Sequence, residues 1–124
     1  MLSDIDATAM IAVRDLEEAR RFYTDVLGFD VRGDETGILS FRSGTTPVSL
    51  YVSEFAGTNR ANALAWSVGD AFDDVVTELR ERGVTFERYD LPGLTLEGEV
   101  HVADGFKGVW FEDPDGNILH VNGR

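Results

Sequence analysis

The chain has 124 residues, 43% of them hydrophobic, so it is long enough to form one globular domain around a buried core. It contains no cysteine, which excludes disulfides, thiolate zinc sites and cysteine nucleophiles. Its 23 acidic and 11 basic side chains give a formal charge of -12, which repels nucleic acid and favours a cationic or neutral ligand.

The first predicted elements are a strand over residues 7–13 and a helix over 16–27. Asp15 is expected to cap this helix, and Gly28 to end it. Side chains alternate along the strand in two sets: Ala9, Ile11 and Val13 on one face, and Thr8, Met10 and Ala12 on the other. The first set is expected to pack against the helix, so the second faces away from it.

Three further strands are predicted over residues 29–32, 37–42 and 48–53, because turn-forming sequences separate them. Residues 56–60 are then a connector to a similar second unit. That unit begins with a strand over residues 63–68. Its side chains form two sets: Leu64, Trp66 and Val68 toward a helix, and Ala63, Ala65 and Ser67 away from it.

In this second unit Asp70 is expected to cap a helix that Gly83 ends. A strand over 84–88 follows. The last predicted element is a hairpin of strands 108–112 and 117–122, joined by the turn sequence Asp113-Pro114-Asp115-Gly116.

The two units are copies of one pattern. Val13 and Val68, Asp15 and Asp70, and Gly28 and Gly83 are each separated by 55 residues. A constant offset across strand, helix and turn indicates a repeated supersecondary unit, with module one at about 5–55 and module two at about 62–124. We therefore expect the functional site to lie between the copies.

Module two is longer than module one. Phe41 and Phe111 occupy corresponding positions but lie 70 residues apart, so about 15 extra residues fall within the second copy. We interpret residues 89–107, which include His101, as a solvent-exposed flap over whatever the sheet encloses.

The repeat, Phe22-Tyr23, Leu27-Gly28-Phe29 and the Asp113 to Asn117 turn together resemble the vicinal oxygen chelate superfamily, over nearly the whole chain. This superfamily includes glyoxalase I, extradiol dioxygenases, and fosfomycin- and bleomycin-resistance proteins. The resemblance implies an α+β fold in which two tandem βαβββ modules form a curved mixed sheet around a cavity, with the helices outside. The small side chains predicted to face inward leave room for a ligand.

Metal-dependent members hold a divalent ion with side chains from four strands. The matching positions here are Thr8, Ala63, His120 and one near Ser49 or Tyr51, and only His120 is a clear ligand. We therefore expect no metal and no other cofactor. The alternative that His101 joins His120 with Glu99 or Glu112 around an ion has no spacing motif to support it.

His120 in place of the usual acid, and the run Asn62 to Trp66, are similar to metal-free bleomycin-resistance proteins. These proteins sequester a cationic drug in grooves between two subunits. The resemblance therefore implies a homodimer that binds a cationic or aromatic small molecule, with a role in antibiotic resistance. The alternative is a lyase, isomerase or dioxygenase in which His120, with His101 or Tyr51, handles a proton or recruits a metal.

The candidate ligand-binding residues are inward-facing or lie in the extra segment: Thr8, Met10, Arg42, Tyr51, Ala63, Ser67, His101, Trp110 and His120. For His120, ligand contact and a purely structural hydrogen-bonded role both stay open. For Trp110, core packing and a stacking surface for a flat ligand stay open.

No apolar run is long enough to span a membrane, and residues 1–4 lack the basic and then apolar pattern of a secretion signal. We expect a soluble cytoplasmic protein that does not bind membranes.

Overall fold

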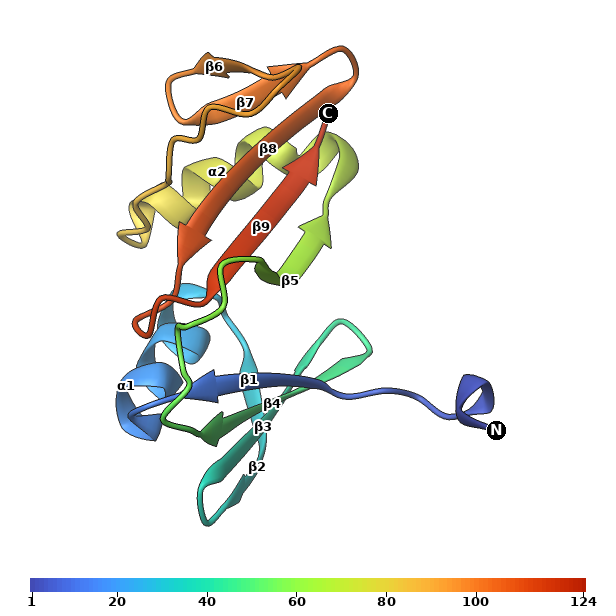
Figure 1. The fold of residues 1–124 in the computed structure, drawn as a ribbon, viewed down its shortest axis with the longest axis vertical. Coiled ribbons are helices and arrows are strands. Elements are labelled where there is room, and N and C mark those ends of the chain that lie inside the picture. The colour runs from blue at the N-terminus through green and yellow to red at the C-terminus, as the bar shows by residue number, and fades with distance from the viewer.

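The computed structural model describes residues 1–124 as two modules, one above the other in Figure 1. After a short 3-10 turn, η1 (Leu2–Asp4), the first module contains β1 (Ala9–Val13), α1 (Leu16–Arg21), the π-helical turn η2 (Phe22–Val26), β2 (Asp30–Glu35), β3 (Ile38–Ser43) and β4 (Thr46–Val52). The second contains β5 (Asn62–Ser67), the 3-10 turn η3 (Gly69–Ala71), α2 (Phe72–Glu81), β6 (Thr95–Glu97), β7 (Val100–Ala103), β8 (Phe106–Glu112) and β9 (Ile118–Gly123).

The two sheets share one topology except for an additional edge strand, β6, in the second, and this confirms the predicted repeat. The first has the order β1-β4-β3-β2, and the second β5-β9-β8-β7-β6. In each, the last strand of the module pairs in parallel with the first strand, and the remaining pairs are antiparallel. The chain is therefore an α+β protein built from two tandem modules.

Strand alternation places one face of each sheet under its helix, as predicted. Ile11 and Val13 of β1 are buried in a cluster with Ala19 of α1 and Tyr23 of η2, whereas Met10 is 54% exposed on the other face. In the second module, α2 packs on β8 and β9 through a separate buried cluster. We call the face of each sheet opposite its helix the concave face.

Only one of the two predicted caps forms. The Asp15 carboxylate accepts hydrogen bonds from the backbone N–H groups of Glu17 (2.9 Å) and Glu18 (3.2 Å). Asp70 does not cap α2, because η3 intervenes and the helix begins at Phe72; Asp70 is exposed and pairs with Arg124 instead. Gly28 ends the first helical segment with φ at +77°.

The predicted flap over 89–107 is wrong. Its middle forms β6 and β7, which pair with one another and extend the sheet beyond β8 (Figure 1). The predicted strand over 84–88 does not form a ladder, and only the Glu87 N–H bonds to a strand, at the Trp110 carbonyl (2.8 Å). The extra residues of module two therefore enlarge its sheet.

Neither helix is both long and apolar enough to cross a lipid bilayer.

A buried polar network joins the modules. The Tyr23 hydroxyl donates to Asp113 Oδ2 (2.8 Å), and the side-chain amide of Asn117 donates both to Asp113 Oδ2 and to the Ala12 carbonyl of β1 (2.8 Å each). Asp113 Oδ1 accepts from the backbone N–H groups of Asp115 and Asn117. Burial and the adjacent Asp113 charge raise the pKa of Tyr23 far above its ordinary value, so its hydroxyl stays a neutral donor.

Removing this carboxylate should destabilise the whole chain. In Asp113→Ala the buried Tyr23 hydroxyl and the Asn117 amide lose their acceptor, and we expect a loss of about 2–4 kcal/mol in the free energy of unfolding. Tyr23→Phe removes only one donor and should cost about 1–2 kcal/mol. Urea unfolding followed by circular dichroism measures both, with Asp6→Ala, at an exposed position, as the control. Equal stability of Asp113→Ala and Asp6→Ala would contradict this account.

Candidate functional site

Aromatic rings gather on the concave face of the second sheet. Trp110 of β8 and His120 of β9 are directly paired across the ladder, and their rings stack with centroids 4.1 Å apart and planes at 19°. His101 of β7 meets Trp110 edge to face at 4.8 Å, and Tyr89 does so at 5.7 Å. We call these four residues and Phe106, which stacks on His120 at 6.5 Å, the aromatic cluster.

The rings of the aromatic cluster can pack closely because β8 has a glycine, Gly108, beside them. Gly108 lies opposite His101 in the sheet, and a Cβ atom added to it would approach Phe106 Cζ to 2.8 Å and His120 Cε1 to 3.0 Å. Any side chain at this position would separate the rings. Gly108 therefore gives the cluster its tight packing.

Both ring nitrogens of His120 are engaged. Nδ1 lies 3.0 Å from the Val109 carbonyl, which can only accept, so Nδ1 carries the proton. Nε2 is then an acceptor, and the Asn122 side-chain amide donates to it over 3.2 Å. Burial lowers the pKa of His120, although the Val109 carbonyl partly opposes this. His120 is therefore a neutral imidazole whose two nitrogens are both hydrogen-bonded within the cluster. This is the geometry expected if its role is structural.

His101 is fully buried, which corrects its predicted place on an exposed flap. β7 lies between β6 and β8, and the backbone N–H of Tyr89 donates to His101 Nε2 over 3.0 Å. In the neutral ring the proton therefore lies on Nδ1, and that nitrogen has no hydrogen-bond partner. His101 thus contacts Trp110 from within the sheet and lines no pocket.

An open pocket of about 490 Å³ adjoins the aromatic cluster. Trp110 and Tyr89 form its aromatic wall, and Leu91 and Ile118 add apolar surface. The Trp110 indole N–H donates to Asn62 Oδ1 over 3.1 Å, which fixes the ring at the pocket wall. Trp110 thus presents an aromatic surface to an accessible cavity.

A smaller pocket of about 290 Å³ lies on the concave face of the first sheet. Three of the candidate ligand-binding residues, Met10, Tyr51 and Ala63, line it together with Phe55. Asn62 lines both this pocket and the larger one, so the two adjoin at a single residue.

The remaining predicted ligand-binding residues lie elsewhere. Thr8 precedes β1 and is exposed, and Ser67, at the end of β5, is exposed and lines no pocket. Arg42 borders a different cavity, between the modules. The nine candidate residues therefore do not share a single cavity.

Sequence analysis missed two central residues of the site, Tyr89 and Asn62. A bulge in β5 skips Ala63 in the pairing with β9, and this irregularity brings Asn62 to the concave face beside Trp110. Strict alternation along the strand cannot anticipate such a shift. Tyr89 reaches the cluster only because the chain after α2 passes along β8.

A model of the Glyoxalase/Bleomycin resistance protein/Dioxygenase superfamily matches residues 5–121. The chain belongs to this superfamily. Its fold is similar to a glyoxalase/bleomycin resistance protein/dioxygenase from Alicyclobacillus acidocaldarius, with 20% identity, a TM-score of 0.72, and coverage of 95% of this chain and 89% of that one. A search among curated proteins gave no match.

Two further solved structures have names that describe a function. FosX from Mesorhizobium loti, a fosfomycin resistance protein, is 17% identical with a TM-score of 0.67, covering 95% of this chain and 90% of its own. TnmS3 from a Streptomyces species, an antibiotic binding protein, is 25% identical with a TM-score of 0.61, covering 96% of each chain.

The divalent ion of metal-dependent superfamily members does not fit these residues. No group of three or more His, Asp or Glu side chains converges anywhere in the chain. His120 already uses both ring nitrogens, Thr8 is exposed, and Ala63 has no donor. Glu99, considered as a partner of His101, instead forms an ion pair with Arg80 at 2.8 Å.

The lowered pKa of His120 should make stability depend on pH. Because the folded state holds this ring neutral, the unfolded state binds more protons once the pH falls below the unfolded pKa of about 6.5. The His120 contribution is present above that pH and is lost as the pH falls through the lower folded pKa. We expect the unfolding free energy to fall between pH 7.5 and 5, more for the parent chain than for His120→Gln. Urea titrations at several pH values test this, and parallel pH profiles would contradict it.

Proposed function

We propose that this superfamily member binds and sequesters a flat organic molecule on the concave face of its second sheet, without a metal ion, in the setting of antibiotic resistance. The observation that carries the proposal is the half-buried ring of Trp110, which contacts His120 and His101 and lines a pocket of about 490 Å³. A pre-positioned indole binds planar ligands at low entropic cost.

Charge favours a neutral or cationic ligand. The chain carries a formal charge of -12, and among the residues lining the pocket only Arg60 is charged. An indole face attracts cations as well as flat rings. Arg60 itself would repel a cation, so the preference for a cationic ligand rests on the negative field of the whole chain and on the indole.

One similar structure, TnmS3, and the site chemistry support binding more than catalysis. FosX and TnmS3 are, by their names, a resistance protein and an antibiotic-binding protein. A proton-transfer role for His120 would require it to give up the Val109 or the Asn122 hydrogen bond. Neither bond needs to break when a ligand stacks on Trp110.

Replacing Trp110 should weaken ligand binding without unfolding the sheet. For the best ligand in a panel of flat cationic and neutral antibiotics, we expect Trp110→Leu to lower affinity about tenfold or more in calorimetric titrations. Trp66→Phe is the matched control, because Trp66 lies outside this pocket and should leave the affinity unchanged. Elemental analysis should find less than stoichiometric metal in the ligand-competent protein.

Failure of every compound to bind, or equal affinity of the parent chain and Trp110→Leu, would refute the proposal. Stoichiometric zinc, iron, nickel or manganese that His120→Ala releases would instead favour the lyase, isomerase or dioxygenase alternative.

We also propose that the chain forms a homodimer. Several large apolar side chains are exposed on or beside the concave face of the first sheet, including Met10 (54%), Ile38 (38%) and Phe55 (69%). A second copy that covers this face would remove them from water, and two-fold pairing is the most frequent form of assembly.

A charge placed within this face should dissociate the dimer. Met10→Glu is expected to give the mass of a single chain in light scattering at micromolar concentration, where the parent chain gives twice that mass. Leu2→Glu, which changes an exposed apolar residue in η1 away from this face, should leave the dimer intact. A parent chain that is monomeric under these conditions would refute the proposal.

A further inference from the structure

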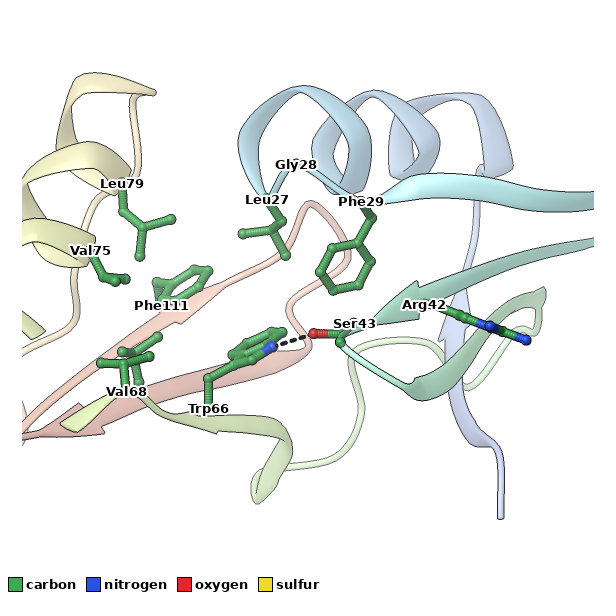
Figure 2. Close-up of a pocket in the computed structure, with 12 residues that line it drawn as sticks. Leu27, Gly28, Phe29, Arg42, Ser43, Trp66, Val68, Val75, Leu79 and Phe111 are labelled. Carbon is green, nitrogen blue, oxygen red and sulfur yellow. Dashed lines mark hydrogen bonds between the residues drawn. The ribbon is translucent and has the colours of Figure 1, made fainter. Parts of the chain in front are cut away.

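A second cavity, separate from the aromatic cluster, lies between the modules (Figure 2). It has a volume of about 310 Å³ and shares no lining residue with the concave pockets. Its walls come from both halves: Leu27 and Phe29 from module one, and Trp66, Val75, Leu79 and Phe111 from module two.

The interior of this cavity offers no partner for a charge. Figure 2 shows Val75 and Leu79 extending from α2 toward Phe111, with Leu27 and Phe29 opposite them. Arg42 is the one charged lining residue, and its side chain extends away from the other lining side chains. The Trp66 indole N–H is satisfied by the Ser43 hydroxyl, at 2.8 Å. A charged ligand in this cavity would lose its hydration and gain no hydrogen-bonded or charged partner in exchange.

The lining favours a small molecule over a protein segment. Every large apolar side chain that is strongly exposed lies elsewhere in the chain, and the apolar residues around this cavity are all buried or half-buried. A protein-docking groove presents exposed apolar side chains around its rim. Here the apolar side chains face the cavity and leave no strongly exposed apolar rim.

We propose that this cavity binds a neutral apolar molecule of one or two rings. An engineered apolar cavity of about 150 Å³ stays dry and binds benzene, and the present cavity has about twice that volume. The aromatic walls from Phe29, Trp66 and Phe111 suit a flat guest. The site goes beyond the ligand proposed for the concave face, and it takes a different chemical class, because it excludes cations.

Such a guest would contact both modules at once. Phe29 and Phe111 belong to the two different buried clusters, and Trp66 packs against both. A molecule that binds only the folded chain stabilises it by an amount that grows with the logarithm of ligand concentration above Kd. Binding should therefore raise the melting temperature of the parent chain as well as change local probes.

The two tryptophans allow the sites to be distinguished. In Trp110→Phe only Trp66 emits, and iodobenzene, a neutral one-ring molecule whose iodine quenches indole fluorescence on contact, should quench it saturably. In Trp66→Phe only Trp110 emits, so the same titration reports on the concave pocket alone and gives that pocket's affinity separately. Toluene should shift the methyl resonances of Val68, Val75, Leu79 and Val121 in NMR spectra, because these residues line the cavity.

Filling the cavity should abolish this behaviour. Val75→Phe, in the Trp110→Phe background, should weaken iodobenzene binding at least about tenfold. Thr77→Phe adds the same ring on the exposed face of α2 and should leave binding unchanged. If Val75→Phe does not fold, Val68→Leu fills the same volume from the other wall, and the toluene-induced methyl shifts of the parent chain remain a direct test.

Three results would overturn the proposal: non-saturating quenching of Trp66, unchanged binding in Val75→Phe, or toluene shifts confined to the concave face. A dimer that Val75→Phe dissociates would show that a second copy occupies the cavity, and would also overturn it. None of these bears on the antibiotic titrations with Trp110→Leu, so the two proposals fail independently.

Discussion

The buried carboxylate of Asp113 is the interaction on which the arrangement of the two modules depends. It receives hydrogen bonds from Tyr23 of module one and from the turn of its own module, while Asn117 extends the network to the Ala12 carbonyl of β1. Breaking this network would leave a buried charge and several buried donors without partners. The network therefore fixes the relative position of two sheets that share no ladder.

Apolar packing alone would specify this arrangement less well. The fully buried residues form two separate clusters, one in each module, and they meet only through partly buried side chains such as Phe22, Leu27 and Trp66. Apolar contacts tolerate sliding, whereas hydrogen bonds to one carboxylate accept only a narrow geometry. The incomplete apolar contact between the clusters is also the reason that a cavity remains there.

Most of the fold could be predicted because its signals are local. The alternation in β1 and the glycines after the helices depend on neighbouring residues, and both appear in the structure. The 55-residue repeat is the recurrence of these local signals in the second module. The errors came from non-local pairing. Residues 95–103 have the turn chemistry of a loop, yet they become strands because β8 offers them an open edge.

The candidate site could be predicted only in part for the same reason. Strand alternation predicts that Trp110 and His120 both face away from the helix, and in the structure they pair with one another on that face. The burial of His101 followed from the unexpected strand β7, and the position of Asn62 followed from a bulge that no periodicity contains. The hydrogen bonds that occupy both nitrogens of His120 depend on Val109 and Asn122, which no metal-ligand pattern identifies.

The connector between the modules has a mechanical consequence. Gly57 has φ at +72°, and a Cβ atom placed on it would lie 1.8 Å from the Asp115 carbonyl oxygen, so the connector backbone rests directly on the 113–117 turn. Any larger residue at position 57 would push the connector away from this turn, and with it the Asp113 carboxylate that the turn carries. The tightest backbone approach between the modules and their shared polar network thus depend on the same few residues.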